Sequence, residues 1–211
     1  MALVVPTALS YDLEDFNSRL RRVRPFASRI HVDVTDGVFS EARTIGLDQV
    51  HGIDGIPFDL HLMFRRPQDQ LARIIALRPK LAIIHAEADC DHAALAAAFR
   101  ANGLKAGLAL LPETAVSSVR DLLPSFDHVL IFTGTLGENG GEFKSECLPK
   151  IAAVKTIKPT LEVSVDGGVT LRNAADAVRA GADILYVGGA IQHAPSPQLA
   201  YEELSRIAKN A

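Results

Sequence analysis

The most informative stretch of this sequence is Ile30-His31-Val32-Asp33-Val34-Thr35-Asp36-Gly37. Apolar side chains alternate in it with His31, Asp33 and Thr35, which is the period-two pattern of a β-strand. Successive side chains of a strand point to opposite faces, so His31 and Asp33 share one face and the apolar side chains turn toward covering helices. Asp36-Gly37 ends the strand with a turn signal. An imidazole and a carboxylate at this end suit a metal ion or a proton transfer, or a hydrogen bond that only orients a loop.

The composition is that of an ordinary globular protein. The 211 residues are 48% hydrophobic and 22% charged, and residues 1–211 fit a single domain. A net charge of -3 argues against a nucleic-acid-binding surface, which would need a basic face. No apolar run approaches the ~20 residues of a membrane span, and the N-terminus has no signal-peptide pattern. Cys90 and Cys147 form no motif and are expected to be free thiols. We therefore expect a cytoplasmic protein with no nucleic-acid or membrane partner.

Short apolar strands alternate with helical segments along the whole chain. Strands are expected at residues 3–9, 29–34, 58–63, 81–87, 105–111, 128–133, 161–166 and 184–187. Helices are expected to open at residues 12–16 and to cover residues 67–77, 91–101, 116–123, 147–157, 173–180 and 198–208. This order predicts an α/β fold, a (β/α)₈ TIM barrel with a parallel sheet. The rival is an open doubly wound sheet, but no glycine-rich nucleotide fingerprint follows the first strand.

Four side chains of the kind that bind metals stand at the carboxyl ends of three predicted strands. They are His31, Asp33, His61 and Asp166. Catalytic groups of TIM barrels lie at these ends, so the four are expected to share one site. Two imidazoles and two carboxylates could hold one divalent ion and leave positions open for substrate oxygens.

Paired glycines follow the last two predicted strands. Gly167-Gly168 comes after one and Gly188-Gly189 after the other. TIM barrels often bind phosphate at this place, because glycine lets backbone N–H groups approach the anion closely. The same pairs could also serve only to make tight turns, and we favour phosphate because both pairs stand at the expected positions.

Across nearly its whole length the chain resembles the ribulose-phosphate 3-epimerase family. The resemblance rests on residues 5–7 (Val-Pro-Thr), 31–37 (His-Val-Asp-Val-Thr-Asp-Gly), 59–63 (Asp-Leu-His-Leu-Met), 107–110 (Gly-Leu-Ala-Leu) and 165–169 (Val-Asp-Gly-Gly-Val). It implies a TIM barrel of the ribulose-phosphate-binding type. It also implies an isomerase of carbohydrate metabolism in the pentose phosphate pathway, most simply one converting D-ribulose 5-phosphate to D-xylulose 5-phosphate.

The resemblance implies roles for particular residues. His31, Asp33, His61 and Asp166 would bind one divalent ion, which could be zinc, iron, manganese or cobalt. Asp33 and Asp166 would also be the catalytic acid and base. Gly167, Gly168, Gly188 and Gly189 would lie at the phosphate, and we add Thr7, Met63, Gly140 and Gly141 to the expected substrate contacts. The expected partner is a sugar phosphate, and we expect a homo-oligomer.

The expected chemistry agrees with these residue types. Inverting a carbon next to a ketone requires that a proton leave one face and another arrive on the opposite face. Two carboxylates can do both, and a divalent ion would stabilise the enediolate between the two steps. Asp59 is a candidate acceptor that would orient His61, or else a solvated loop carboxylate. His85 and Glu87 are expected to be ordinary polar residues and not ligands.

The sequence departs from the family at three places. Thr35 replaces a methionine, and Gly188-Gly189 replaces the usual Gly-Ser. The Pro-Gly-Phe-Gly-Gly loop of the family is replaced by residues 136–141, Leu-Gly-Glu-Asn-Gly-Gly. Because threonine is shorter than methionine and carries a hydroxyl, we expect a wider and more polar space above the sugar at Thr35. We expect Glu138 to face solvent.

Other functions are left open. A six-carbon ketose phosphate such as D-allulose 6-phosphate is the alternative substrate, and a non-catalytic sugar-phosphate-binding barrel is the alternative from another class. A decarboxylase or hexulose-phosphate synthase would carry Asp-x-Lys-x-x-Asp on a strand, and residues 30–37 contain no lysine. A Schiff-base aldolase needs a lysine near the carboxyl ends of the strands, and Lys105 begins its strand.

Overall fold

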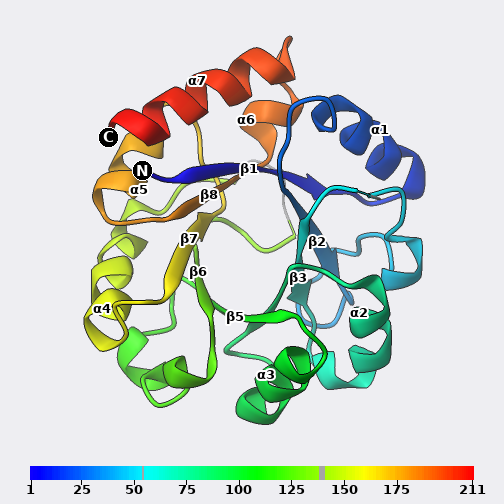
Figure 1. Cartoon of the computed structure of the whole chain (residues 1–211), viewed down its shortest axis with the longest axis vertical. Coiled ribbons are helices and arrows are strands. Elements are labelled where there is room, and N and C mark those ends of the chain that lie inside the picture. The colour runs from blue at the N-terminus through cyan, green and yellow to red at the C-terminus, as the bar shows by residue number, and fades with distance from the viewer. Residues whose placement is uncertain (54, 138–140) are drawn as a thin grey trace.

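The computed structural model describes residues 1–53, 55–137 and 141–211, and in them the strands form a closed parallel barrel with helices outside it (Figure 1). The strands follow the order of the chain, each pairing with the next, and the last pairs with the first. They are β1 (Leu3–Leu9), β2 (Ile30–Thr35), β3 (Phe58–Met63), β4 (Leu81–His85), β5 (Lys105–Leu110), β6 (His128–Phe132), β7 (Glu162–Asp166) and β8 (Ile184–Val187). The predicted TIM barrel is therefore confirmed.

The described helices cover the outside of the barrel. They are α1 (Leu13–Val23), α2 (Leu71–Leu77), α3 (His92–Ala101), α4 (Pro149–Ile157), α5 (Ala174–Arg179), α6 (Gly189–Gln192) and α7 (Pro197–Asn210). Side chains cap the starts of α1, α3 and α7. The Asp12 carboxylate accepts a hydrogen bond from the Asp15 N–H at the start of α1, and Ser196 caps α7 in the same way. Pro149 and Pro197 stand in first turns, where a missing N–H costs nothing.

Strand alternation divides the core into two parts, one on each side of the sheet. The apolar side chains of β2, Ile30, Val32 and Val34, belong to the larger cluster between sheet and helices. Val5, Leu130 and other inward side chains fill the barrel itself. His31 and Asp33 therefore point into the barrel, as the alternation predicts.

One predicted helix is wrong. The segment expected to be helical at residues 116–123 forms one short 3₁₀ helix, Val116–Val119, and a second, Leu123–Ser125, begins at its last residue. Pro124 lacks an N–H, and the branched side chains of Val116 and Val119 disfavour a continuous α-helix. The predicted helices at residues 67–77 and 147–157 each begin with a 3₁₀ turn, and their α-helical parts start at Leu71 and Pro149.

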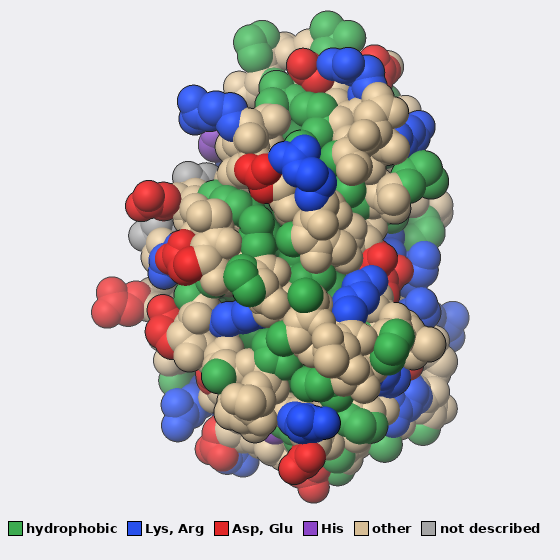
Figure 2. Space-filling view, turned by 90° about the vertical axis from the view of Figure 1, so that its left-hand side faces the viewer, with side chains coloured by type: hydrophobic (Ala, Val, Ile, Leu, Met, Phe, Trp, Pro, Cys, Tyr) green, Lys and Arg blue, Asp and Glu red, His purple; other side chains and the backbone are tan. Residues whose placement is uncertain are grey.

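Charged side chains of both signs are mixed over the face shown in Figure 2, with no continuous basic area on it. None of the helices in the described parts of the chain is long and apolar enough to cross a membrane. Cys90 and Cys147 are free, as expected, and Cys147 is buried.

Candidate metal and catalytic site

A cavity of about 330 Å³ opens at the carboxyl ends of the strands, where TIM barrels place their active sites. This volume suits a small ligand. Most of the predicted substrate and catalytic residues line it: Thr7, Asp33, Met63, Gly141, Asp166, Gly167, Gly168, Gly188 and Gly189. Gly140 lies outside the described residues. His31 and His61 are fully buried and are not part of the lining.

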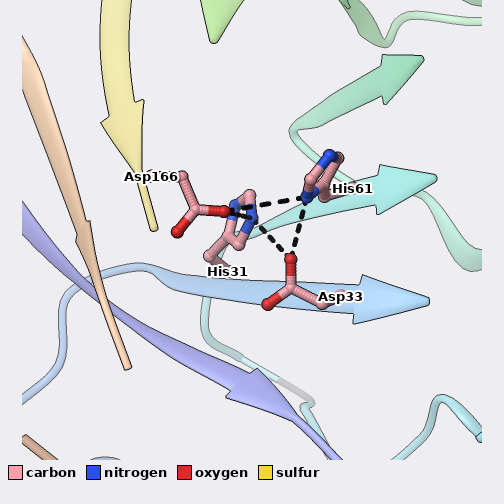
Figure 3. A group of neighbouring side chains, drawn as sticks. All are labelled: His31, Asp33, His61 and Asp166. Atoms are coloured by element: carbon pink, nitrogen blue, oxygen red, sulfur yellow. Dashed lines mark hydrogen bonds and ion pairs between the residues drawn. The ribbon is translucent and has the colours of Figure 1, made fainter. Parts of the chain in front are cut away.

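The structure brings the four candidate metal ligands together (Figure 3). Asp33 on β2 is the register partner of His61 on β3, so both side chains point inward at the same level. Asp33 Oδ1 lies 3.1 Å from His31 Nε2 and 2.9 Å from His61 Nδ1. Asp166 Oδ2, from β7, lies 3.8 Å from each of these two nitrogens. One donor atom from each residue lies within 4.8 Å of the others, so the group could hold a metal ion.

The two carboxyl groups have different electrostatic environments. Burial opposes ionisation of Asp33, but the imidazoles of His31 and His61 outweigh it and hold the pKa of that carboxyl below its usual range. Burial raises the pKa of Asp166 to about 6, and the charge of Asp33 adds to the increase. Burial alone would lower the pKa of His31, yet the Asp33 carboxylate beside it raises that pKa above the ordinary value. The two carboxyl groups, which lie in one cluster, therefore differ in acidity: Asp33 is held ionised, whereas Asp166 accepts a proton much more readily.

Asp59 does not orient His61, and it is not solvated. It is fully buried, and its carboxylate accepts hydrogen bonds from Arg29 Nε at 2.9 Å and from the Tyr186 hydroxyl at 2.8 Å. The ring of Tyr186 stacks on His31 with centroids 3.8 Å apart. Both expectations for Asp59 are therefore wrong. Its register partner on β2 is His31 and not Asp33, so it lies one level deeper in the barrel than His61.

The second ring nitrogen of His61 contacts His85 on β4. The two Nε2 atoms are 2.8 Å apart, and the rings are stacked with centroids 4.9 Å apart. Burial lowers the pKa of His85 to about 4, so this ring is neutral near pH 7. Its Nδ1 faces the carboxylate of Glu87 at 3.4 Å. His85 and Glu87 lie outside the four clustered donor residues and form a chain of contacts that ends at His61.

The glycines after β7 let two loops pack very closely. Gly167 and Gly168 have φ angles of +102° and +72°, which disfavour any side chain. A Cβ on Gly167 would lie 2.3 Å from the Gly134 nitrogen, and one on Gly168 would lie 2.4 Å from the Gly141 carbonyl oxygen. These two glycines therefore serve a tight turn and also line the cavity. Gly188 and Gly189 begin α6 on the same cavity wall.

Two of the three departures from the family, Thr35 and the replaced loop at its residue Gly137, lie near the loop that follows β2. The Thr35 hydroxyl is 2.9 Å from Ser40 Oγ and 3.3 Å from the Ala42 carbonyl oxygen, and Thr35 is not among the residues that line the cavity. The loop after β6 reaches the same region, because a Cβ on Gly137 would lie 2.4 Å from the Ala42 Cβ and 3.3 Å from Ser40 Oγ. Glu138 lies outside the described residues. Thr35 therefore stabilises its own loop and adds no polar group to the wall of the cavity.

Several residues that line the cavity were not among the expected site residues, and two of them, Tyr186 and His193, carry polar side chains that could contact a ligand. Tyr186 lies on β8 and alternates with the outward-facing Leu185 and Val187. Its inward direction was therefore available from the period-two pattern. His193, just after α6, carries no comparable local signal.

Comparisons with known proteins show the family to which this chain belongs. The model of the ribulose-phosphate 3 epimerase family matches residues 3–192. The ribulose-phosphate 3-epimerase of Schizosaccharomyces pombe is 32% identical over 204 residues, 93% of this chain and 90% of that protein. That of Bacillus subtilis is 33% identical over 201 residues, 90% of this chain and 92% of that protein.

More distant solved structures share the barrel. KGPDC from Streptococcus mutans has a TM-score of 0.77 at 11% identity and covers 99% of this chain and 98% of its own. The 3-hexulose-6-phosphate synthase from Salmonella typhimurium has a TM-score of 0.73 at 14% identity and covers 99% of both chains. At such identities the likeness shows the fold alone, whereas the sequence matches favour an epimerase over the decarboxylase, synthase and binding-protein alternatives. The chain belongs to the ribulose-phosphate 3-epimerase family and is an epimerase.

Proposed function

We propose that this protein inverts C3 of a phosphorylated ketose with the help of one divalent metal ion. D-ribulose 5-phosphate is the first substrate to test. One observation carries the proposal: a single cavity is lined at once by the carboxylates of Asp33 and Asp166 and by the glycine loops after β7 and β8. The groups for proton transfer and for phosphate binding are therefore within reach of one small molecule.

The four clustered side chains fit a divalent ion. Their donor set is two imidazole nitrogens and two carboxylate oxygens, which zinc, iron, manganese and cobalt all accept. His31, Asp33, His61 and Asp166 would hold the ion, and its charge would offset the two buried carboxylates. When bound, the ion would stabilise negative charge that develops on the ketose oxygens.

Asp33 and Asp166 would move the protons. They come from β2 and β7, and both face the cavity. A ketose bound between them would present one face of C3 to each carboxylate. One carboxylate would remove the C3 proton, the other would return a proton to the opposite face, and the roles would exchange in the reverse reaction.

Backbone N–H groups would hold the phosphate. The Gly167-Gly168 turn and the start of α6 at Gly189 line the same cavity. The first N–H groups of a helix have no partner within it, so they are available to an anion. A sugar without phosphate would leave these donors unpaired, which is costly in a partly buried site.

The structure motivates a test of substrate length. The family's methionine is replaced by Thr35, whose side chain bonds its own loop and does not line the cavity, so it takes up no space beside the sugar. A six-carbon substrate such as D-allulose 6-phosphate is for this reason the second candidate.

The experiment is a panel of ketose phosphates and their free sugars, each incubated with metal-loaded protein in deuterated water. We expect loss of the C3 proton signal in at least one phosphorylated ketose and much slower exchange in its free sugar. Equal exchange in free sugars would refute the phosphate site. Absence of exchange in every ketose phosphate would refute the proposed reaction. Full activity of metal-free protein would refute the proposed requirement for a divalent ion.

A further inference from the structure

The side chain of Tyr186 reaches across the interior of the barrel between two strands that are not neighbours. Its backbone lies on β8, and its hydroxyl donates a hydrogen bond to Asp59 Oδ2 on β3 at 2.8 Å. Tyr186 is 1% exposed and lines the cavity. Its ring stacks on the imidazole of His31, with centroids 3.8 Å apart and planes 30° apart. Tyr186 therefore contacts one of the four clustered donor residues from outside the cluster.

The hydroxyl end of this tyrosine is held by a buried ion pair. Arg29 Nε lies 2.9 Å and 2.8 Å from the two oxygens of the Asp59 carboxylate. Both residues are buried, and charge-assisted hydrogen bonds are stronger than neutral ones. A carboxylate only accepts hydrogen bonds, so the tyrosine hydroxyl and the guanidinium both donate to Asp59. The ring of Tyr186 is thus fixed at one end by β8 and at the other by Asp59.

His31 depends on its surroundings for the orientation of its ring. Nε2 faces the cluster, 3.1 Å from Asp33 Oδ1 and 3.8 Å from Asp166 Oδ2, whereas Nδ1 has no hydrogen-bond partner among the described residues. Rotation of an imidazole about χ2 has only broad intrinsic preferences, so neighbouring groups must set the plane of the ring. At a centroid distance of 3.8 Å, a turn out of the stack would drive imidazole atoms into the ring of Tyr186. The ring of His61 is farther away and tilted, with centroids 5.4 Å apart.

We propose that Tyr186 is a positioning residue whose anchored ring holds the imidazole of His31 in the plane that directs Nε2 at the centre of the candidate metal site. Histidine ligands are usually oriented by a hydrogen bond to their second ring nitrogen, and the stacked tyrosine serves the same purpose at His31. The metal in this proposal rests on the proposed function, whereas the stack of the two rings does not.

Two substitutions separate the effect of the ring from that of the hydroxyl. Tyr186→Leu removes the stack, whereas Tyr186→Phe keeps the ring and removes only the hydrogen bond to Asp59. The matched control is Phe126→Leu, because Phe126 is a fully buried ring in the cluster between sheet and helices, on the other side of the sheet from His31. Urea unfolding of each variant identifies conditions under which all of them are folded.

The first readout is zinc affinity, measured by chelator competition. Tyr186→Leu should bind Zn²⁺ about 10–100-fold more weakly than the wild type, as is typical when a group that orients a ligand is lost. Tyr186→Phe should lose less affinity than Tyr186→Leu, and Phe126→Leu should bind zinc like the wild type. The second readout is the NMR spectrum of metal-free protein. The ring current of residue 186 should shift the carbon-bound ring protons of His31 upfield in the wild type and in Tyr186→Phe, but not in Tyr186→Leu.

Unchanged zinc affinity in Tyr186→Leu, or an equal loss in Phe126→Leu, would overturn the positioning role. Equal losses in Tyr186→Leu and Tyr186→Phe would also overturn it, because the hydroxyl and not the ring would then be responsible. If Tyr186→Leu does not fold, Tyr186→Met, which has a long apolar side chain and no ring, takes its place with the same expected results. Failure of the wild type to bind zinc would refute the proposed metal site itself. The His31 proton shifts would then still test the stack, and a wild type without the upfield shift would overturn it.

Discussion

Substitution of Gly168 by alanine should open the cavity wall on which the phosphate is expected to bind. The added Cβ would lie 2.4 Å from the Gly141 carbonyl oxygen, whereas ordinary contacts begin near 3.4 Å, so the two loops must separate by about 1 Å. Displacements of this size can cost ~10²-fold in catalysis. We expect kcat/KM for the phosphorylated ketose to fall by that order, and the free energy of unfolding to fall by the sum of two effects.

The first effect is the strain of a left-handed backbone conformation, which lowers the free energy of unfolding by roughly 1–2 kcal/mol for a residue other than glycine. The second is the overlap with backbone atoms, for which about 1–3 kcal/mol is typical. Gly103→Ala isolates the first effect, because Gly103 has a φ of +78° and nothing within 4 Å of an added Cβ.

Both variants can be compared by urea unfolding followed by far-ultraviolet circular dichroism, since the chain has no tryptophan. Gly168→Ala should be the less stable of the two and alone should lose activity. Equal stability and equal kcat/KM in the two variants would refute the reasoning about loop contact.

Three further predictions concern the carboxylates of the barrel. Asp33→Asn and Asp166→Asn should each lower turnover by ~10²-fold or more without loss of folding, measured by steady-state assay and circular dichroism. Asp59→Ala should lower the free energy of unfolding by about 3–5 kcal/mol, because the buried Arg29 loses its hydrogen-bonded carboxylate and keeps only the longer contact with Glu162 at 3.9 Å, and an exposed control such as Asp69→Ala should change little. The hydrogen bond from His128 lowers the pKa of Glu162 to about 2 from 4.5. Its stabilising contribution is thus present above pH 4.5 and lost as the pH falls toward 2. The difference in thermal stability between wild type and Glu162→Gln should shrink over this window, and a constant difference would contradict the assignment.

Much of the fold could be predicted because local patterns and global topology agree. The strands Phe58–Met63 and Ile184–Val187 begin and end where the apolar runs predict. The proximity of His31, Asp33 and His61 follows from inward alternation on two neighbouring parallel strands. Such arguments need only the direction of each side chain and the order of the strands.

Contacts that depend on the level of a residue inside the barrel could not be predicted. Asp59 and His61 alternate identically on β3, yet Asp59 pairs with Arg29 and Tyr186, and His61 contacts His85. The stagger between strands decides which side chains share a layer, and no local pattern reveals it. The helix predicted at residues 116–123 was wrong for another reason. The apolar spacing of this segment suits a helix, but its residue types favour short turns.

The account rests on two carboxylates that act on opposite faces of C3, and deuterium exchange in the two asparagine variants tests this most directly. A variant with one remaining carboxylate can remove the C3 proton of one epimer and return deuterium to the same face. We predict that Asp33→Asn and Asp166→Asn, each loaded with metal in deuterated water, exchange opposite epimers of the ketose phosphate and interconvert neither at an appreciable rate. Exchange of the same epimer by both variants, or near wild-type epimerisation by either, would contradict the two-base mechanism.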